Sequence, residues 1–212
     1  MFVGHYAGAF VACGLERRLS LGAAFVAAQL VDVGWDVFVL TGVEHARLVP
    51  GLPSNPLDLY DMPYSHSLAA TVLWSLLAAV IVWAVWRSGR LAAVVGATVA
   101  SHWFLDLIVH RPDLPLLGTS STKLGAGLWN YPMAALLVEL VVLSASAVFY
   151  VRRTGASTRW IGGFVLALCA IQVATVFGPL PPSLMAMCAS LLAAYTAFAL
   201  AAGWVGRRAI AR

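Results

Sequence analysis

The chain has 212 residues, of which 61% are hydrophobic and only 10% are charged. Soluble domains usually carry about 25% charged residues, so this composition excludes an ordinary water-soluble globular protein. The formal net charge of +4 does not indicate a nucleic-acid partner, because the basic residues form short clusters at the ends of apolar runs, as membrane topology signals do.

Seven apolar segments follow one another along the chain, roughly at 2–15, 20–43, 66–86, 91–110, 128–151, 159–177 and 183–206. A helix needs about 20 apolar residues to cross the hydrocarbon core. We therefore predict an all-α, polytopic transmembrane helical bundle of about seven spans in a lipid bilayer. The first segment is short for a full crossing, so it either tilts or stops partway through the membrane.

The 13 basic residues divide unequally between the two ends of this bundle if the segments alternate in direction. Three of them lie at one end: Arg47, Arg111 and Lys123. Ten lie at the other: Arg17, Arg18, Arg87, Arg90, Arg152, Arg153, Arg159, Arg207, Arg208 and Arg212. Basic residues concentrate on the cytoplasmic side, so we predict an external N-terminus and a cytoplasmic C-terminus. The two long proline-containing segments, 44–65 and 111–127, are then external and not helical.

Histidines and acidic residues gather toward the predicted outer face. All five histidines lie at or near it, and Asp32 and Asp36 occupy the outer half of the second segment. In the fourth segment His102, Asp106 and His110 recur every four residues, which places them on one stripe of a helix. The predicted alternation of the segments thus brings imidazoles and carboxylates from separate helices to one depth.

This combination predicts a divalent metal site. A carboxylate at the centre of a bilayer costs about 2.5–3.5 kcal/mol on insertion scales, and two carboxylates one turn apart repel each other. A shared cation removes both penalties. Imidazoles and carboxylates are ligands of zinc and other first-row divalent metals, and the outer half has only three basic residues for an ion-pair network.

Four fragments resemble a known family. They are Gly4-His5, Asp32 after an apolar run, Pro63-Tyr64-Ser65-His66-Ser67-Leu68, and Ser101-His102-Trp103-Phe104-Leu105-Asp106. They look like the motifs of YdjM-like membrane-bound, metal-dependent hydrolases, and the run from His110 to Asn130 is similar to a branch of bacterial membrane proteins with the same core. The chain departs from the family at the D-x-D-H motif, which here is Asp32-x-x-x-Asp36 with His45 nine residues later.

The resemblance implies a zinc-dependent hydrolase in the bacterial cytoplasmic (inner) membrane, with its site facing outside and a lipid or lipid-linked ester or phosphoester as substrate. Metal-binding or catalytic roles carry over to His5, Asp32, His66, His102 and Asp106, with Asp36, His45 and His110 as additions. A carboxylate that is not a ligand, Asp106 or Asp36, would serve as general base. Ser65 and Ser67 would support His66 by hydrogen bonds. We interpret residues 1–212 as one membrane domain, with a motif-bearing core at 1–127 and three additional spans at 128–212.

Two other functions remain open from the sequence. The polar residues also suit a metal- or proton-coupled transporter, although that function needs polar side chains in both halves of the bundle, and the cytoplasmic halves carry few. A membrane protein that binds a metal or a partner without catalysis is the second alternative, because a packed polar network can simply hold helices together.

Overall fold

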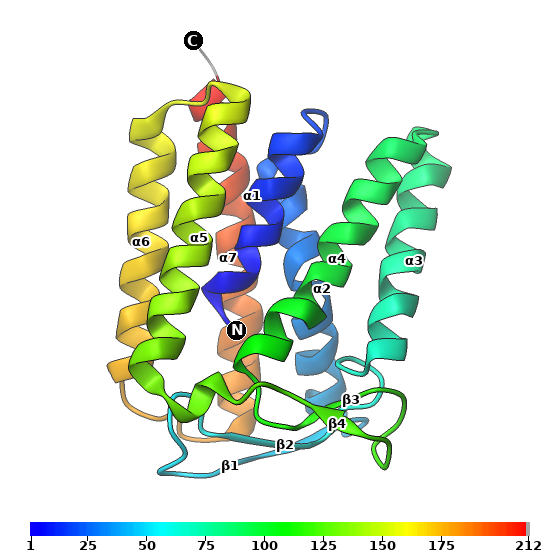
Figure 1. Cartoon of the computed structure of the whole chain (residues 1–212), viewed down its shortest axis with the longest axis vertical. Coiled ribbons are helices and arrows are strands. Elements are labelled where there is room, and N and C mark those ends of the chain that lie inside the picture. Colours follow the sequence, from blue (N-terminus) through cyan, green and yellow to red (C-terminus); the bar gives the residue numbers. More distant parts are fainter. Residues whose placement is uncertain (211–212) are drawn as a thin grey trace.

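The computed structural model, which describes residues 1–210, is a bundle of helices with short strands at one end (Figure 1). A short 3₁₀ helix, η1 (Val3–His5), leads into α1 (Tyr6–Leu15). The long helices are α2 (Leu21–Leu40), α3 (Leu68–Trp86), α4 (Gly89–Val109), α5 (Pro132–Thr154), α6 (Thr158–Phe177) and α7 (Leu184–Ile210). These six are long and apolar enough to cross a membrane, whereas the first apolar segment, Val3–Leu15, is shorter. The predicted helical bundle is confirmed in the part of the chain described, which has seven α-helices, six of them candidate membrane spans instead of about seven.

Local signals in the sequence set the helix boundaries. Ser20, Ser67 and Ser88 precede α2, α3 and α4, and each serine hydroxyl accepts a hydrogen bond from a backbone N–H of the first turn. Such caps satisfy donors that a helix start leaves unpaired. Helix α5 begins at Pro132 and ends before Gly155, whose φ of 72° is favourable for glycine.

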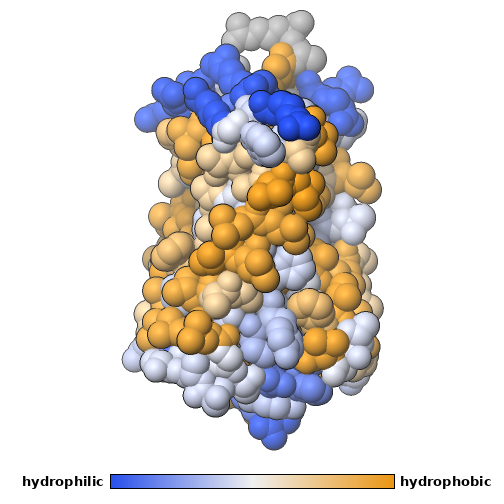
Figure 2. Space-filling model, turned by 90° about the vertical axis from the view of Figure 1, so that its right-hand side faces the viewer, coloured by the Kyte–Doolittle hydropathy of each residue, from blue (hydrophilic) through white to orange (hydrophobic). Residues whose placement is uncertain are grey.

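The two ends of the bundle differ in charge. The end of α1, the α3–α4 turn, the α5–α6 turn and the end of α7 lie together (Figure 1), and they carry nine of the ten arginines assigned to one side. We call this the arginine end; the tenth, Arg212, lies outside the described residues. Figure 2 shows hydrophilic residues at the two extremities and a broad hydrophobic belt between them, as expected for a protein surrounded by lipid.

The opposite end, here the strand end, holds two short antiparallel pairs that the sequence did not predict. Strand β1 (His45–Leu48) pairs with β2 (Leu57–Asp61), and β3 (Leu114–Pro115) pairs with β4 (Lys123–Leu124). Arg111 joins the two long segments, because its guanidinium donates to the carbonyl oxygens of Pro53 and Asn55 at 2.7 and 3.2 Å. These segments are non-helical, as predicted, and they form a folded cover over the bundle.

The chain starts inside the bundle and not at its outer face. Met1 is only 8% exposed, Val3, Gly4 and His5 are buried, and the N-terminus lies near mid-height in Figure 1. The sequence had left open whether the first segment crosses fully or stops partway, and the structure has the second arrangement within the bundle. A helix of the length of Val3–Leu15 rises only about 20 Å, less than the ~30 Å hydrocarbon core, and its C-terminal end lies at the arginine end.

Two apolar clusters flank a polar layer. Along α2, Phe25 packs in the cluster toward the arginine end and Trp35 packs in the cluster toward the strand end. Asp32 lies between them. Along α4, His102 and Asp106 lie between Val99, in a third apolar cluster, and Val109, in the cluster at the strand end. The fold therefore holds the polar residues at one depth, closer to the strand end.

Candidate metal centre

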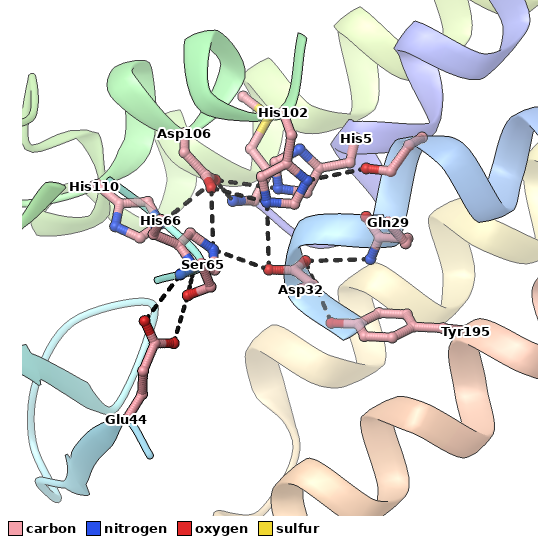
Figure 3. A network of polar contacts seen from close by, with 12 residues as sticks. His5, Gln29, Asp32, Glu44, Ser65, His66, His102, Asp106, His110 and Tyr195 are labelled. Atoms are coloured by element: carbon pink, nitrogen blue, oxygen red, sulfur yellow. Dashed lines mark hydrogen bonds and ion pairs between the residues drawn. The ribbon is translucent and has the colours of Figure 1, made fainter. Parts of the chain in front are cut away.

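Six residues from four regions of the chain converge in this polar layer. His5 comes from η1, Asp32 from α2, His66 from the segment before α3, and His102 and Asp106 from successive turns of α4, with His110 just after it (Figure 3). We call these six residues the His/Asp cluster. The four histidines and Asp106 are at least 96% buried, so their polar atoms must find partners inside the protein.

The imidazole Nε2 atoms face the two carboxylates. His102 Nε2 lies 3.1 Å from Asp106 Oδ2 and 3.3 Å from Asp32 Oδ1. His66 Nε2 lies 3.2 Å from Asp32 Oδ1 and 3.7 Å from Asp106 Oδ2. These spacings bracket the roughly 3.4 Å expected between neighbouring ligand atoms around a tetrahedral zinc with bonds of about 2.0–2.1 Å.

The other oxygen of Asp106 faces a second set of groups. Asp106 Oδ1 lies 3.1 Å from His5 Nε2 and 3.4 Å from His110 Nε2, and the amino group of Met1 forms an ion pair with it. The His5 ring stacks on the His102 ring with centroids 3.6 Å apart. Two groups of three residues could each hold a metal ion, because within each group the ligand atoms lie within 4.8 Å of one another. One group is His5, Asp32 and His102, and the other is His66, His102 and Asp106. His102 belongs to both, which makes it the centre of the arrangement.

In His102 and His110, the contacts of Nδ1, the ring nitrogen that points away from the cluster, indicate that Nδ1 carries a proton. His102 Nδ1 lies 2.9 Å from the Ala28 carbonyl oxygen, and His110 Nδ1 lies 2.7 Å from the Asp113 carboxylate. Both partners only accept hydrogen bonds, so each Nδ1 must donate. The neutral form of each ring then presents a lone pair at Nε2, directed at the carboxylates. Metal-binding histidines are usually oriented by this kind of outer contact.

Glu44 orients His66 through Ser65. Ser65 Oγ donates to Glu44 Oε2 at 2.6 Å and lies 2.8 Å from His66 Nδ1. The hydroxyl has a single proton, so His66 Nδ1 donates to Ser65. Glu44 is 1% exposed and also accepts from the backbone N–H groups of Tyr64 and Ser65 at 2.6 and 2.9 Å.

Unpartnered atoms in the cluster fit a cation. Both ring nitrogens of His5, His102 Nε2 and Asp106 Oδ2 are buried without a hydrogen-bond partner among the described residues. The Met1 ammonium neutralises one carboxylate, but Asp32 Oδ2 has only the neutral donors Gln29 and Tyr195, at 3.3 and 3.4 Å. Lone pairs and carboxylate oxygens at 3.1–3.7 Å repel one another unless a proton on Nε2 or a metal ion lies between them. The donor set therefore fits a divalent metal ion.

The structure brings together most, but not all, of the residues predicted from the sequence. His45 lies in β1, where its Nδ1 is 2.8 Å from Asp61 Oδ2 and half of its side chain is exposed, so it does not reach the cluster. Hydrogen bonds from Thr119 and then from His45 hold the pKa of Asp61 below its usual value. Ser67, expected to support His66, instead caps α3 and donates to the Pro63 carbonyl oxygen.

Asp36 lies one turn from Asp32 toward the strand end and is fully buried. Neither of its carboxylate oxygens makes a hydrogen bond to the described residues. It is also absent from the wall of the cavity described next, so the structure separates it from the open part of the site.

A cavity of about 680 Å³ adjoins the cluster. Its polar wall includes Asp32, His66, Asp106, His110 and Glu139. Glu139 Oε2 accepts from the backbone N–H groups of Phe2 and Gly4 at 3.0 and 3.2 Å. Glu139 was not among the site residues predicted from the sequence, because the approach of η1 to α5 is a tertiary contact.

Comparisons with models of protein families, with curated proteins and with solved structures return no match for this chain.

Proposed function

We propose that this protein is an integral membrane hydrolase that depends on a divalent metal ion, zinc before others. The observation that carries the proposal is the convergence of imidazole Nε2 atoms and carboxylate oxygens from separate regions of the chain, at spacings of 3.1–3.7 Å, beside a cavity large enough for a substrate. The motifs shared with YdjM-like membrane-bound hydrolases support the same reaction class.

The charge distribution supports an orientation for this site. The arginine end would face the cytoplasm, since basic residues collect there, and the strand end would face outward. The His/Asp cluster would then lie in the outer half of a bacterial cytoplasmic membrane. A substrate for such a site is a lipid or lipid-linked ester or phosphoester.

Asp32, His66, His102 and Asp106 would hold the metal, with His5 and His110 completing its surroundings. A divalent ion there supplies Lewis-acid activation of a water molecule and of the scissile group. Ser65, Ala28 and Asp113 keep the ring nitrogens oriented from behind. Hydrolysis adds the water oxygen to the acyl carbon or phosphorus, breaks the ester bond, and gives a proton to the departing oxygen.

Glu139 is the side chain best placed to accept the proton of the attacking water. It lines the cavity and forms no ion pair with the four imidazoles of the cluster, unlike Asp32 and Asp106. We therefore prefer Glu139 as general base to Asp106, which would itself hold the metal, and to Asp36, which does not line the cavity.

Packing between the cluster and the arginine end disfavours a transporter. Phe10, Phe25, Leu143 and Ile161 are fully buried there, and they fill the space that a polar path would need. A serine nucleophile is disfavoured too. Ser65, His66 and Asp32 are in contact one after another, as in a serine–histidine–aspartate triad. Ser65 is nevertheless fully buried, does not line the cavity and is hydrogen-bonded to Glu44.

The test is hydrolysis by the full chain in lipid bilayers, before and after metal removal. We expect ester or phosphoester cleavage that disappears with a chelator and returns with zinc, and a Glu139→Gln variant that keeps its metal but loses roughly 10²-fold or more in kcat. Full activity in metal-stripped protein would contradict the proposal.

A further inference from the structure

The cavity extends away from the cluster between α6 and α7. Besides the polar residues already described, its wall includes Ile171 and Ala174 of α6 and Leu191, Ala194 and Phe198 of α7. These side chains are apolar, so one cavity joins a polar compartment to an apolar one. We call the apolar part the α6/α7 cleft.

The cleft reaches the surface of the bundle within the height of the spans. Ala174, Thr175 and Ser190 line the cavity and are themselves exposed. They lie in the last third of α6 and the first third of α7, in the half of the bundle nearer the strand end (Figure 1). Helix α7 packs mainly against α2 and much less against α6, which explains why a gap persists here. This part of the opening therefore faces the membrane, while loop residues such as Asn55 and Pro179 line another part of the cavity at the strand end.

Gln172 marks the junction between the two compartments. Its side chain is 5% exposed, lines the cavity, and its Oε1 atom has no hydrogen-bond partner among the described residues. An unpaired buried amide oxygen costs free energy unless a ligand supplies a donor. Its unpaired oxygen adds a polar acceptor to the mostly apolar wall that α6 contributes.

We propose that the substrate is an amphiphile with a long aliphatic chain, which reaches the site sideways from the outer leaflet. Its ester or phosphoester group lies at the His/Asp cluster, and its chain lies in the α6/α7 cleft. The inference deepens the proposed hydrolase and rests on it for the reaction. The binding of the chain follows from the cleft alone, because its apolar lining matches an aliphatic chain in shape and polarity.

The first experiment maps binding without using activity. Metal-free full-length protein in bilayers is irradiated with a diazirine-labelled palmitate, and the labelled peptides are identified. We expect labels on α6 and α7 around Ile171 and Leu191. Ala194→Phe and, as a second and more exposed variant, Ala174→Phe narrow the cleft. Because a phenyl ring at either position occupies space that the aliphatic chain would fill, both variants should reduce labelling of α6 and α7 several-fold.

Ala193→Phe is the matched control, since Ala193 is exposed on α7 and does not line the cavity. It should leave labelling unchanged. The second experiment compares hydrolysis of p-nitrophenyl acetate with that of p-nitrophenyl palmitate in the metal-loaded protein. Ala174→Phe should raise KM for the palmitate ester more than KM for the acetate ester, whereas Ala193→Phe should leave both values unchanged.

The outcomes separate the two proposals. Labels outside α6 and α7, or equal losses in the Ala193 and Ala194 variants, overturn the inference even if acetate hydrolysis is intact. Labelling that follows the cleft, combined with no hydrolysis of either ester, supports the binding site and overturns the hydrolase.

Discussion

Replacing Glu44 with glutamine should weaken metal binding, although Glu44 is not itself a ligand. Glu44 Oε1 accepts from two backbone N–H groups, so the amide oxygen of the introduced glutamine must occupy that position. The amide nitrogen then faces Ser65 Oγ, which lies 2.6 Å from Oε2 in the wild type. An amide N–H donates, so Ser65 must turn its own proton toward His66 Nδ1. This forces the proton of neutral His66 onto Nε2 and removes the lone pair that faces the cluster.

The expected loss is large enough to measure. Partners behind a metal ligand typically contribute 10–100-fold to affinity, or about 1.4–2.7 kcal/mol. Zinc affinity of Glu44→Gln would be measured by chelator competition in detergent-solubilised protein, with circular dichroism to show that the variant is folded. Asp58→Asn is the control, because Asp58 lies in β2 and pairs with Arg47 at the surface, where ion pairs contribute little. A folded Glu44→Gln protein with wild-type zinc affinity would refute the proposed proton arrangement.

Three further predictions concern the helix packing, the ligand set and the strand end. Gly22→Val should lower the thermal stability by about 1–3 kcal/mol, because a Cβ there would lie 2.8 Å from the Ala199 carbonyl oxygen; unchanged melting would argue against this close helix contact. His5→Ala should lower zinc affinity whereas His45→Ala should not, and equal affinities would contradict the assigned positions. The pKa of Asp61 is depressed, so its stabilisation is present above the unfolded pKa of about 4 and is lost as pH falls below it. Asp61→Asn should therefore reduce the slope of melting temperature against pH between about 5 and 3, and an unaltered slope would argue against the Asp61 contacts.

Much of the fold could be predicted because lipid imposes simple constraints. Long apolar runs, serine caps and the ten-to-three division of basic residues each reflect local chemistry, and the six long spans follow from them. The sequence could not settle how deep the first segment lies in the bundle. This depth depends on tertiary hydrogen bonds from the backbone of Phe2 and Gly4 to Glu139. Strands β1 and β2 alternate between polar and apolar residues only over four or five positions, which is too short a pattern to predict a strand among the surrounding prolines.

The candidate site was predictable where helical periodicity applies. His102 and Asp106 share a helix face, and their spacing alone brings them together. His45 was placed with them only because it follows the second segment, and the strand carries it away to Asp61. Glu44 precedes His45 directly, but its role depends on the fold of residues 62–66 around its carboxylate, for which no sequence spacing gives a signal.

Metal content of the purified full chain tests the central claim most directly. Wild-type protein, exposed to zinc and then freed of excess metal, should retain a stoichiometric divalent ion by mass spectrometry. His102→Ala should lose it while keeping its helical content, because both ligand sets include His102. A folded wild-type protein without bound metal, or a His102→Ala variant that retains the full amount, would contradict the account.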